Sequence, residues 1–354
     1  MHYSKILVRA TNWVGDAVMS LPALRAIRDR FPAAEIAVLA KPWVADLYAR
    51  ESWCDRTILY PAEKGWRARL QVAAELRRER FDCAILLQNA FEAALIAWLA
   101  RVPVRIGYDR DARGFLLTNA VRVPKPGEIP AHQRFYYLEL LRRAGVIDVV
   151  PDSPSIRLER PEVAATATVG VSPGAAYGSA KRWLPERFAE AAVRLARESG
   201  GGVAIFGSGA ERLLCEEVAG AVRAAGVEVR NYAGETSLGQ FIELAAACRV
   251  FLTNDSGAMH IASALGVPTI TVFGATDHVA TGPTGELARV VREAVECSPC
   301  LLRECPIDHR CMTAVTAERV VSEALSVISL VGIGGVRASS AGPDTVRGAP
   351  APKV

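Results

Sequence analysis

Short apolar segments alternate with longer amphipathic segments along most of the chain, and this alternation constrains the fold more than any other feature. In the first half the apolar segments read KILVRA, EIAVLA, RTILY, CAILL and VRIGY, and helix-like segments separate them. The first of these, DAVMSLPALRAIRDRFP, is expected to form one amphipathic helix over residues 16–32. Continuous apolar strands separated by helices are typical of a parallel sheet that is covered on both faces. We therefore expect a parallel α/β domain over residues 1–160.

The second half repeats the alternation, with the strand-like segments TVGVSP, GVAIFG, RVFLTND and PTITVFG. A polar, proline-rich stretch near residues 150–165 indicates the domain boundary. We expect a second doubly wound domain over residues 161–328 and a disordered, Gly/Ala/Pro-rich tail over 329–354. Ligands of such sheets bind at the carboxyl ends of the strands, so a cleft between two facing domains is the expected site.

Charge is distributed unevenly along the chain. Residues 1–160 hold 25 Lys/Arg and 18 Asp/Glu, a net charge of +7, whereas residues 161–354 hold 17 and 20, a net charge of −3. A basic first half indicates an anionic partner or an acidic membrane face, although ordinary solvated surface explains it equally well. The sequence has no apolar run near the roughly 18–20 residues of a membrane span, and it starts directly in a strand, so we expect a cytoplasmic protein.

Four of the eight cysteines lie close together, in the segment CSPCLLRECPIDHRC. They are Cys297, Cys300, Cys305 and Cys311. The first pair has the spacing of a small zinc knuckle, but the second pair is spaced more loosely than is usual for a structural zinc site. Disulfides do not persist in a cytosolic chain. A metal site and a reduced cluster that staples a loop therefore both remain open.

The segment FLTNDSGAMHIASALGVP combines a strand end with a helix start. Asp255 and Ser256 are good candidates for helix N-caps, and Gly257 leaves backbone N–H groups open to an incoming oxygen atom. The positive end of the helix dipole there suits a pyrophosphate, and His260 follows one turn later. The alternative is an ordinary capped helix with a histidine that is satisfied by its neighbours.

Two further loops follow strands of the second half, in GVSPGAAYGSAKRW and IFGSGAERL. Lys181 is either a phosphate counter-charge or, with Arg182, a solvated charge pair. Glu211 either caps the next helix or accepts hydrogen bonds from a sugar or ribose hydroxyl. Together these loops suit a nucleotide diphosphate with an attached sugar. The dinucleotide fingerprint and the P-loop are both missing, which disfavours nicotinamide enzymes and P-loop NTPases.

Four segments together resemble glycosyltransferase family 9: NWVGDAVMSLPAL, PGAAYGSAKRW, NDSGAMHIASALGVP and the cysteine cluster. They match in order, and the resemblance runs from about residue 4 to about residue 325. It implies a GT-B fold, in which two Rossmann-like domains face a central cleft. It also implies an ADP-heptose donor bound mainly by the second domain and a lipopolysaccharide inner-core acceptor bound by the first. Transfer would invert the anomeric carbon and require no metal or other cofactor.

The resemblance also assigns roles to individual residues. It makes Asp16 the general base and Lys181 the lysine that faces the donor phosphates. The other donor-binding positions that it implies are Glu211, Asp255, Ser256, Gly257 and His260. An inverting transfer needs a base that takes the proton of the acceptor hydroxyl, across the cleft from the departing diphosphate. Asp16 lies in the acceptor domain and meets this requirement, whereas Asp255 does not.

The expected activity is therefore transfer of L-glycero-D-manno-heptose from ADP-heptose onto a heptose of the inner core. The expected partners are the donor, the acceptor and the cytoplasmic face of the inner membrane, with no nucleic acid. A basic helix near residues 66–80 would contact the membrane through Arg67, Arg69, Arg77, Arg78 and Arg80. The alternatives are a family member with another acceptor and a sugar-nucleotide epimerase of GT-B shape. A non-catalytic binding protein is disfavoured by Asp16 and Lys181.

Overall fold

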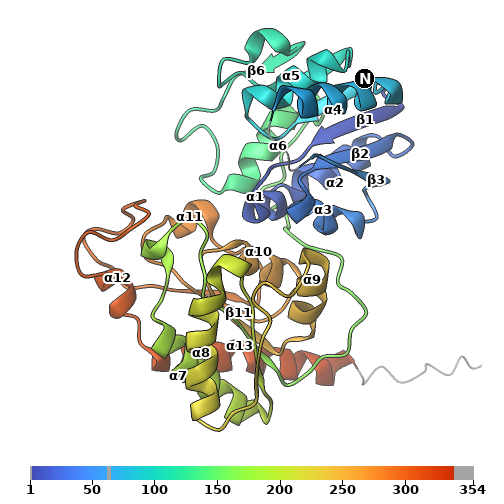
Figure 1. Ribbon diagram of the computed structural model, residues 1–354. Coiled ribbons are helices and arrows are strands. Elements are labelled where there is room, and N and C mark those ends of the chain that lie inside the picture. The colour runs from blue at the N-terminus through green and yellow to red at the C-terminus, as the bar shows by residue number, and fades with distance from the viewer. Residues whose placement is uncertain (1, 62–64, 339–354) are drawn as a thin grey trace, which may run out of the picture.

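The computed structural model describes residues 2–61 and 65–338 and shows two parallel six-stranded sheets, each flanked by helices on both faces (Figure 1). The predicted α/β architecture of two doubly wound domains is confirmed. No helix in this part of the chain is long and apolar enough to cross a membrane.

The first sheet has the strand order β3-β2-β1-β4-β5-β6. Its strands are β1 (Lys5–Arg9), β2 (Glu35–Ala40), β3 (Arg56–Leu59), β4 (Cys83–Leu86), β5 (Val104–Tyr108) and β6 (Asn119–Val121). The chain reverses direction across the sheet between β1 and β4, which makes this point the switch point where open parallel sheets bind ligands.

The second sheet has the order β12-β11-β10-β7-β8-β9, which is the same winding with its switch point between β7 and β10. Its strands are β7 (Val169–Ser172), β8 (Val203–Ile205), β9 (Val229–Asn231), β10 (Val250–Asn254), β11 (Thr269–Val272) and β12 (Ala288–Val291). Residues 144–168, which precede β7, contain no helix or strand, and the predicted boundary at residue 160 lies in this linker.

Helices cover both faces of each sheet. Those of the first domain are α1 (Val14–Met19), α2 (Leu21–Arg30), α3 (Pro42–Ala49), α4 (Trp66–Glu79), α5 (Phe91–Leu99) and α6 (Gln133–Arg143). Those of the second are α7 (Pro185–Ser199), α8 (Arg212–Ala224), α9 (Leu238–Ala247), α10 (Gly257–Ala264), α11 (His278–Thr281), α12 (Arg310–Thr313) and α13 (Ala317–Ala338). Short 3-10 turns lie at Gly114–Leu116 (η1), Ser179–Lys181 (η2) and Gly209–Glu211 (η3).

The two domains share a buried apolar interface. Helices α1 and α3 of the first domain pack against α10 and α9 of the second (Figure 1), and one apolar cluster runs through all four helices. Polar contacts border this interface: Asp46 accepts a hydrogen bond from the Gly239 backbone N–H over 3.0 Å, and Arg50 lies 3.2 Å from Glu243. The interface therefore brings the start of α1 to the start of α10.

Two local expectations need correction. The amphipathic segment expected as one helix from residue 16 to residue 32 is broken at Ser20, between α1 and α2. Pro22 explains the break, because proline has no N–H to continue the hydrogen bonds of α1. The tail expected to be disordered from residue 329 is helical as far as Ala338, the end of α13, and residues 339–354 lie outside the described residues.

Candidate active site

A buried asparagine holds together the two loops at the switch point of the second sheet. Asn254, the last residue of β10, accepts a hydrogen bond from the Trp183 backbone N–H over 2.9 Å and donates one to the Pro173 carbonyl over 2.7 Å. The loop after β7 is thereby fixed against the loop after β10. The sequence predicted a strand end in this segment but not this role of Asn254, because both partners lie more than 70 residues away.

Lys181 and Asp255 form an ion pair between these loops. The Lys181 Nζ atom lies 2.6 Å from Asp255 Oδ2, and the Thr276 hydroxyl donates a 2.6 Å hydrogen bond to the same oxygen. Both charged side chains are largely buried. Lys181 is thus not half of a solvated pair with Arg182, and Thr276 is a member of the site that the sequence analysis did not identify.

The expected capping of α10 by Asp255 does not occur. Ser256 is the N-cap residue, and no side chain caps the helix. The Ser256 hydroxyl instead lies 3.1 Å from the Thr253 hydroxyl. The start of α10 therefore keeps backbone N–H groups that no cap side chain occupies, next to the Lys181 ammonium group.

A cavity of about 420 Å³ lies between the domains at this point. Its walls include Trp13, Gly15 and Asp16 from the first domain and Tyr177, Lys181, Asp255, Ser256, Gly257, His260 and Arg303 from the second. The structure thus brings Asp16 and five of the six predicted donor-binding residues to one cavity. The sixth, Glu211, lines an adjoining cavity of about 290 Å³ that shares Ser256 and Gly257 with the first.

Glu211 caps the turn that precedes α8, which was one of the two interpretations of this residue in the sequence analysis. Its Oε2 atom accepts hydrogen bonds from the Ser208 backbone N–H over 2.9 Å and from the Ser208 hydroxyl over 2.8 Å. The carboxylate still borders the adjoining cavity, together with Gly174 and Phe206. Capping and hydroxyl recognition are therefore compatible at this residue.

Asp16 lies in the first turn of α1, where a carboxylate is favoured by the helix dipole. Burial outweighs this effect: loss of solvent raises the pKa of Asp16, and a hydrogen bond from the Tyr137 hydroxyl opposes the rise. The two oxygen atoms are 3.1 Å apart, and Tyr137 is almost fully buried in α6. A carboxylate that is partly buried, held in place and raised in pKa is suited to accept a proton.

His260 is buried where the two domains touch. Burial lowers its pKa to about 4, so its imidazole ring is neutral at neutral pH. The ring lies against Gly15 of α1, where a Cβ atom would stand only 3.0 Å from His260 Cδ2. At neutral pH the His260 ring is therefore a neutral hydrogen-bonding group without a positive charge.

The cysteine-rich loop packs beside the cavity mainly through backbone contacts. The Leu301 N–H donates to the Ala275 carbonyl over 2.8 Å, and the Tyr177 hydroxyl donates to the Leu301 carbonyl over 2.8 Å. The four cysteines are free thiols, and the described residues include no group of three His, Cys, Asp or Glu side chains that could hold a metal ion. The loop brings Arg303 to the cavity wall.

Comparisons with known proteins show which family this chain resembles in sequence. The family model for glycosyltransferase family 9 (heptosyltransferase) matches residues 69–310. The lipopolysaccharide heptosyltransferase 2 of Salmonella typhimurium is 33% identical over 93% of this chain and 100% of its own length. The lipopolysaccharide heptosyltransferase 2 of Escherichia coli is 34% identical over 81% of this chain and 88% of its own length.

A solved structure of a heptosyltransferase has the same fold as this chain. The E. coli ADP-heptose lipopolysaccharide heptosyltransferase II superposes with a TM-score of 0.80 and 29% identity, over 93% of this chain and 99% of that chain. The shared architecture is the GT-B arrangement of two facing Rossmann-like domains. On its family match, its relatives and its fold, the chain belongs to glycosyltransferase family 9, the heptosyltransferases.

Proposed function

We propose that this protein transfers a heptose from ADP-heptose onto a heptose of the lipopolysaccharide inner core, with inversion at the anomeric carbon. The observation that carries the proposal is the cavity between the domains. It sets the carboxylate of Asp16 on the wall of the first domain, and Lys181 and the start of α10 on the wall of the second. A base and a leaving-group site on opposite walls are what an inverting transfer requires.

The reaction assigned to this cavity is a single displacement. The acceptor hydroxyl oxygen forms a bond to the anomeric carbon of the heptose, and its proton passes to the Asp16 carboxylate. The bond between that carbon and the diphosphate breaks, and ADP leaves with the electron pair. Lys181 and the backbone N–H groups at Ser256 and Gly257 stabilise the negative charge on the departing diphosphate.

The adjoining cavity suits the nucleoside part of the donor. Its walls combine the apolar side chains of Phe206, Leu238 and Phe241 with the carboxylate of Glu211. Apolar walls accommodate a base, and a fixed carboxylate accepts hydrogen bonds from ribose hydroxyls. The diphosphate would then lie at Ser256 and Gly257, which the two cavities share.

We further propose that the first domain docks on the cytoplasmic face of the inner membrane. Large apolar side chains are exposed on α4, α5 and η1, namely Trp66, Leu70, Phe91, Trp98 and Phe115. Exposed arginines of α4 and its end accompany them, namely Arg67, Arg77, Arg78 and Arg80. Aromatic side chains beside basic ones suit an anionic lipid surface. Arg69 does not belong to this set, because it pairs with Glu92 at 2.9 Å.

A transfer assay tests the proposed activity. The purified protein is given ADP-heptose with inner-core acceptors that carry either no heptose or one heptose. We expect product only with the acceptor that carries one heptose. Product with the heptose-free acceptor would support the alternative family member, and isomerisation of ADP-heptose without an acceptor would support the epimerase.

A sedimentation assay tests the membrane contact separately. Reversal of charge at Arg67, Arg77 and Arg78 should reduce binding to vesicles that contain anionic phospholipid and leave ADP affinity unchanged. Equal sedimentation of the variant and the unaltered protein would refute this contact. The same reversal at Arg194 and Arg223, exposed on α7 and α8 of the second domain, serves as the control.

A further inference from the structure

The cysteine-rich loop, residues 297–311, contributes one charged side chain to the cavity between the domains. This side chain is Arg303, and it lines the cavity together with Tyr177, Lys181 and Asp16. Arg303 does not line the adjoining cavity that we assign to the nucleoside. The loop therefore reaches the part of the site where the sugar of the donor and the phosphate next to it would lie.

Backbone contacts fix the loop to the segment that carries Lys181. The Ala180 N–H donates to the Arg303 carbonyl over 3.0 Å, and the His309 Nε2 atom lies 3.0 Å from the Ala180 carbonyl oxygen. The chains approach so closely that a Cβ atom on Gly178 would overlap the Arg303 carbonyl oxygen. These contacts place the Arg303 backbone beside Lys181 without any contribution from the Arg303 side chain.

The guanidinium group of Arg303 shares an aromatic ring with the ammonium group of Lys181. The Arg303 Cζ atom lies 5.2 Å from the centre of the Tyr177 ring, and the Lys181 Nζ atom lies 4.9 Å from the same centre. The Tyr177 hydroxyl donates to the Leu301 carbonyl over 2.8 Å, which attaches the ring to the cysteine-rich loop. Cation–π attraction to one ring thus holds both cations at the cavity wall.

The charge of Lys181 is already offset inside the cavity, whereas that of Arg303 is not. Lys181 lies 2.6 Å from Asp255, and both side chains are largely buried. Arg303 is exposed, and its guanidinium group forms no ion pair or hydrogen bond with the part of the chain that the structure describes. A sugar-linked diphosphate carries a negative charge on each phosphate, so it calls for a cation besides the pair of Lys181 and Asp255.

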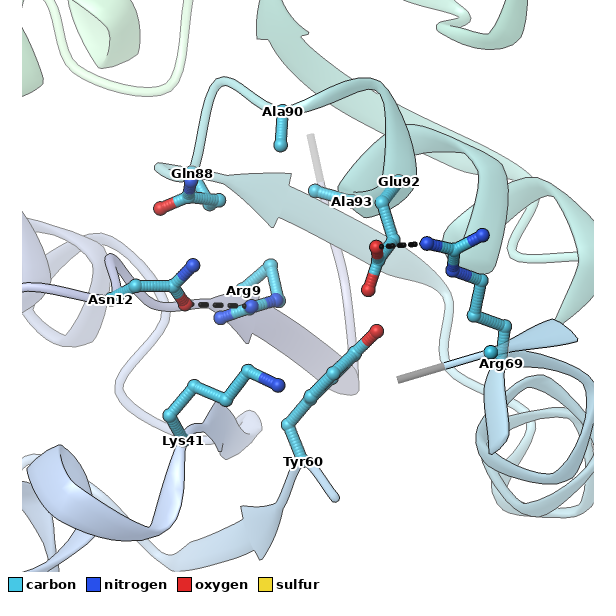
Figure 2. A pocket seen from close by; sticks show the side chains of 10 residues that line it. Arg9, Asn12, Lys41, Tyr60, Arg69, Gln88, Ala90, Glu92 and Ala93 are labelled. Atoms are coloured by element: carbon cyan, nitrogen blue, oxygen red, sulfur yellow. Dashed lines mark hydrogen bonds and ion pairs between the residues drawn. The ribbon is translucent and has the colours of Figure 1, made fainter. Parts of the chain in front are cut away.

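Arginines that line a separate polar cavity, in the first domain, are held differently (Figure 2). Arg9 donates to the Asn12 side chain there over 2.9 Å. Arg69 lies 2.9 Å from the Glu92 carboxylate, as the second dashed line in Figure 2 shows. Side chains of the protein engage both of these guanidinium groups. The guanidinium group of Arg303 has no such partner among the described residues, so its N–H donors are available to a ligand.

We propose that Arg303 binds the β-phosphate of the donor, which is the phosphate bonded to the sugar. This inference rests on the proposed function. The two cavities share Ser256 and Gly257, and Arg303 lines only the cavity on the side away from the nucleoside. A planar guanidinium group can donate two parallel hydrogen bonds to phosphate oxygens. When the bond between the anomeric carbon and the β-phosphate oxygen breaks, the electron pair stays on that oxygen, where Arg303 stabilises it.

Titrations of the full-length protein with ADP and with AMP test the assignment. AMP lacks the β-phosphate and keeps the rest of the nucleotide. We expect Arg303→Gln to weaken ADP binding about tenfold and to leave AMP binding unchanged. Arg303→Lys should recover part of the loss, because it keeps the charge but not the planar pair of donors.

Arg310→Gln is the matched control. Arg310 is an exposed arginine of the same loop, but it pairs with Asp308 at 3.0 Å and does not line the cavity. This variant should bind ADP and AMP like the unaltered protein. Since the Arg303 backbone and not its side chain holds the loop, the melting temperature of Arg303→Gln should also be unchanged.

Transfer kinetics test the effect on bond breaking. With ADP-heptose as the donor, Arg303→Gln should lower kcat as well as raise KM, because negative charge on the β-phosphate increases in the transition state. An unchanged kcat would overturn the role of Arg303 in bond breaking.

The outcomes separate this assignment from the proposed function. Unchanged ADP affinity in Arg303→Gln, or equal losses of ADP and AMP affinity, would overturn the assignment and leave the proposed transfer standing. A protein that binds ADP in an Arg303-dependent way but transfers no heptose would overturn the proposed activity and leave the role of Arg303 in binding the β-phosphate.

Discussion

Two opposing effects act on the pKa of the Asp16 carboxylate. Burial disfavours its ionised form, and the hydrogen bond from Tyr137 favours it. The net effect is a raised pKa, which makes the carboxylate a stronger base than an exposed aspartate while it remains held in one orientation. Such a site lowers the free energy of unfolding, because an ionised group is kept away from water for the sake of function.

Asp16→Asn should therefore slow transfer strongly and not lower the stability of the fold. We expect a loss of about 10²- to 10⁴-fold in kcat, the usual contribution of a general base. ADP-heptose binding should be unchanged, and the melting temperature should be equal or higher, because the variant buries no charge. Kinetics, calorimetry and thermal unfolding check these three points. Substantial remaining activity would place the base elsewhere.

Tyr137→Phe should move the pH dependence of the reaction. Removal of the hydroxyl leaves burial unopposed, so the pKa of Asp16 rises further. The base is active when ionised, and the acidic limb of the kcat/KM profile should shift to higher pH. Tyr48→Phe is the control, because Tyr48 is another buried tyrosine of the first domain and does not bond to Asp16. A profile that is identical in both variants would contradict this role of Tyr137.

The residues that the sequence analysis identified at the site are those inside contiguous motifs. Asp16, Lys181 and Asp255 each lie within nine residues of the end of a strand. The carboxyl ends of parallel strands lie at one edge of a sheet, so the order of strands and loops predicts that these residues lie near such an edge. Tyr137 and Thr276 were not predicted. Their contacts to the site span 121 and 21 residues, and neither lies in a pattern that marks it before the domains are packed.

At the scale of elements, the contact between α1 and α10 depends on two glycines. A Cβ atom on Gly257 would lie 2.9 Å from Val14 Cβ, and one on Gly15 would lie 3.0 Å from the His260 ring. Neither glycine has a positive φ angle, so their role is to allow the two helices to approach closely. The contact joins a wall of the donor site to the helix that carries Asp16.

Gly257→Ala should increase the distance between α1 and α10 at this contact. Overpacking of this kind costs about 1–3 kcal/mol of stability, and displacement of the α10 start should also reduce affinity for ADP. Gly220→Ala in α8 is the matched control, because its added Cβ meets no atom within 4 Å. That variant should gain about 0.4–1 kcal/mol. Urea unfolding and ADP titration of both variants measure the difference, and equal effects would contradict the packing argument.

Strands and long helices were predictable because their apolar periodicity is local. The sequence predicted that each sheet is doubly wound but not the order of its strands, because strand pairing depends on contacts between distant segments. Helix interruptions were not predicted correctly: Pro22 was read inside one helix, although it separates α1 from α2. The last residues of α13 were predicted to belong to a disordered tail, because the sequence after them is rich in Gly, Ala and Pro.

At the scale of the whole molecule, the domains meet through a surface that is both apolar and titratable. His260 lies in this interface with Asp255 and Lys181 nearby, and His132 of the first domain bonds to the Gly282 carbonyl of the second over 2.9 Å. The His132 Nδ1 atom accepts from the Arg134 N–H, so its Nε2 atom carries the proton that it donates. Burial lowers the pKa of both histidines. The packed molecule thus favours two neutral imidazoles.

This preference predicts acid sensitivity of the folded protein. The folded-state pKa of His260, about 4, is lower than the ordinary value of 6.5, so its contribution to stability is complete above pH 6.5 and is lost as the pH falls towards 4. The shift corresponds to about 3 kcal/mol. Urea unfolding of the unaltered protein and of His260→Gln, each at pH 7.5 and at pH 4.5, measures this contribution. Carboxylates titrate in both proteins and cancel in the difference, so the unaltered protein should lose more stability by most of that amount. Equal losses in the two proteins would show that His260 titrates normally in the interface.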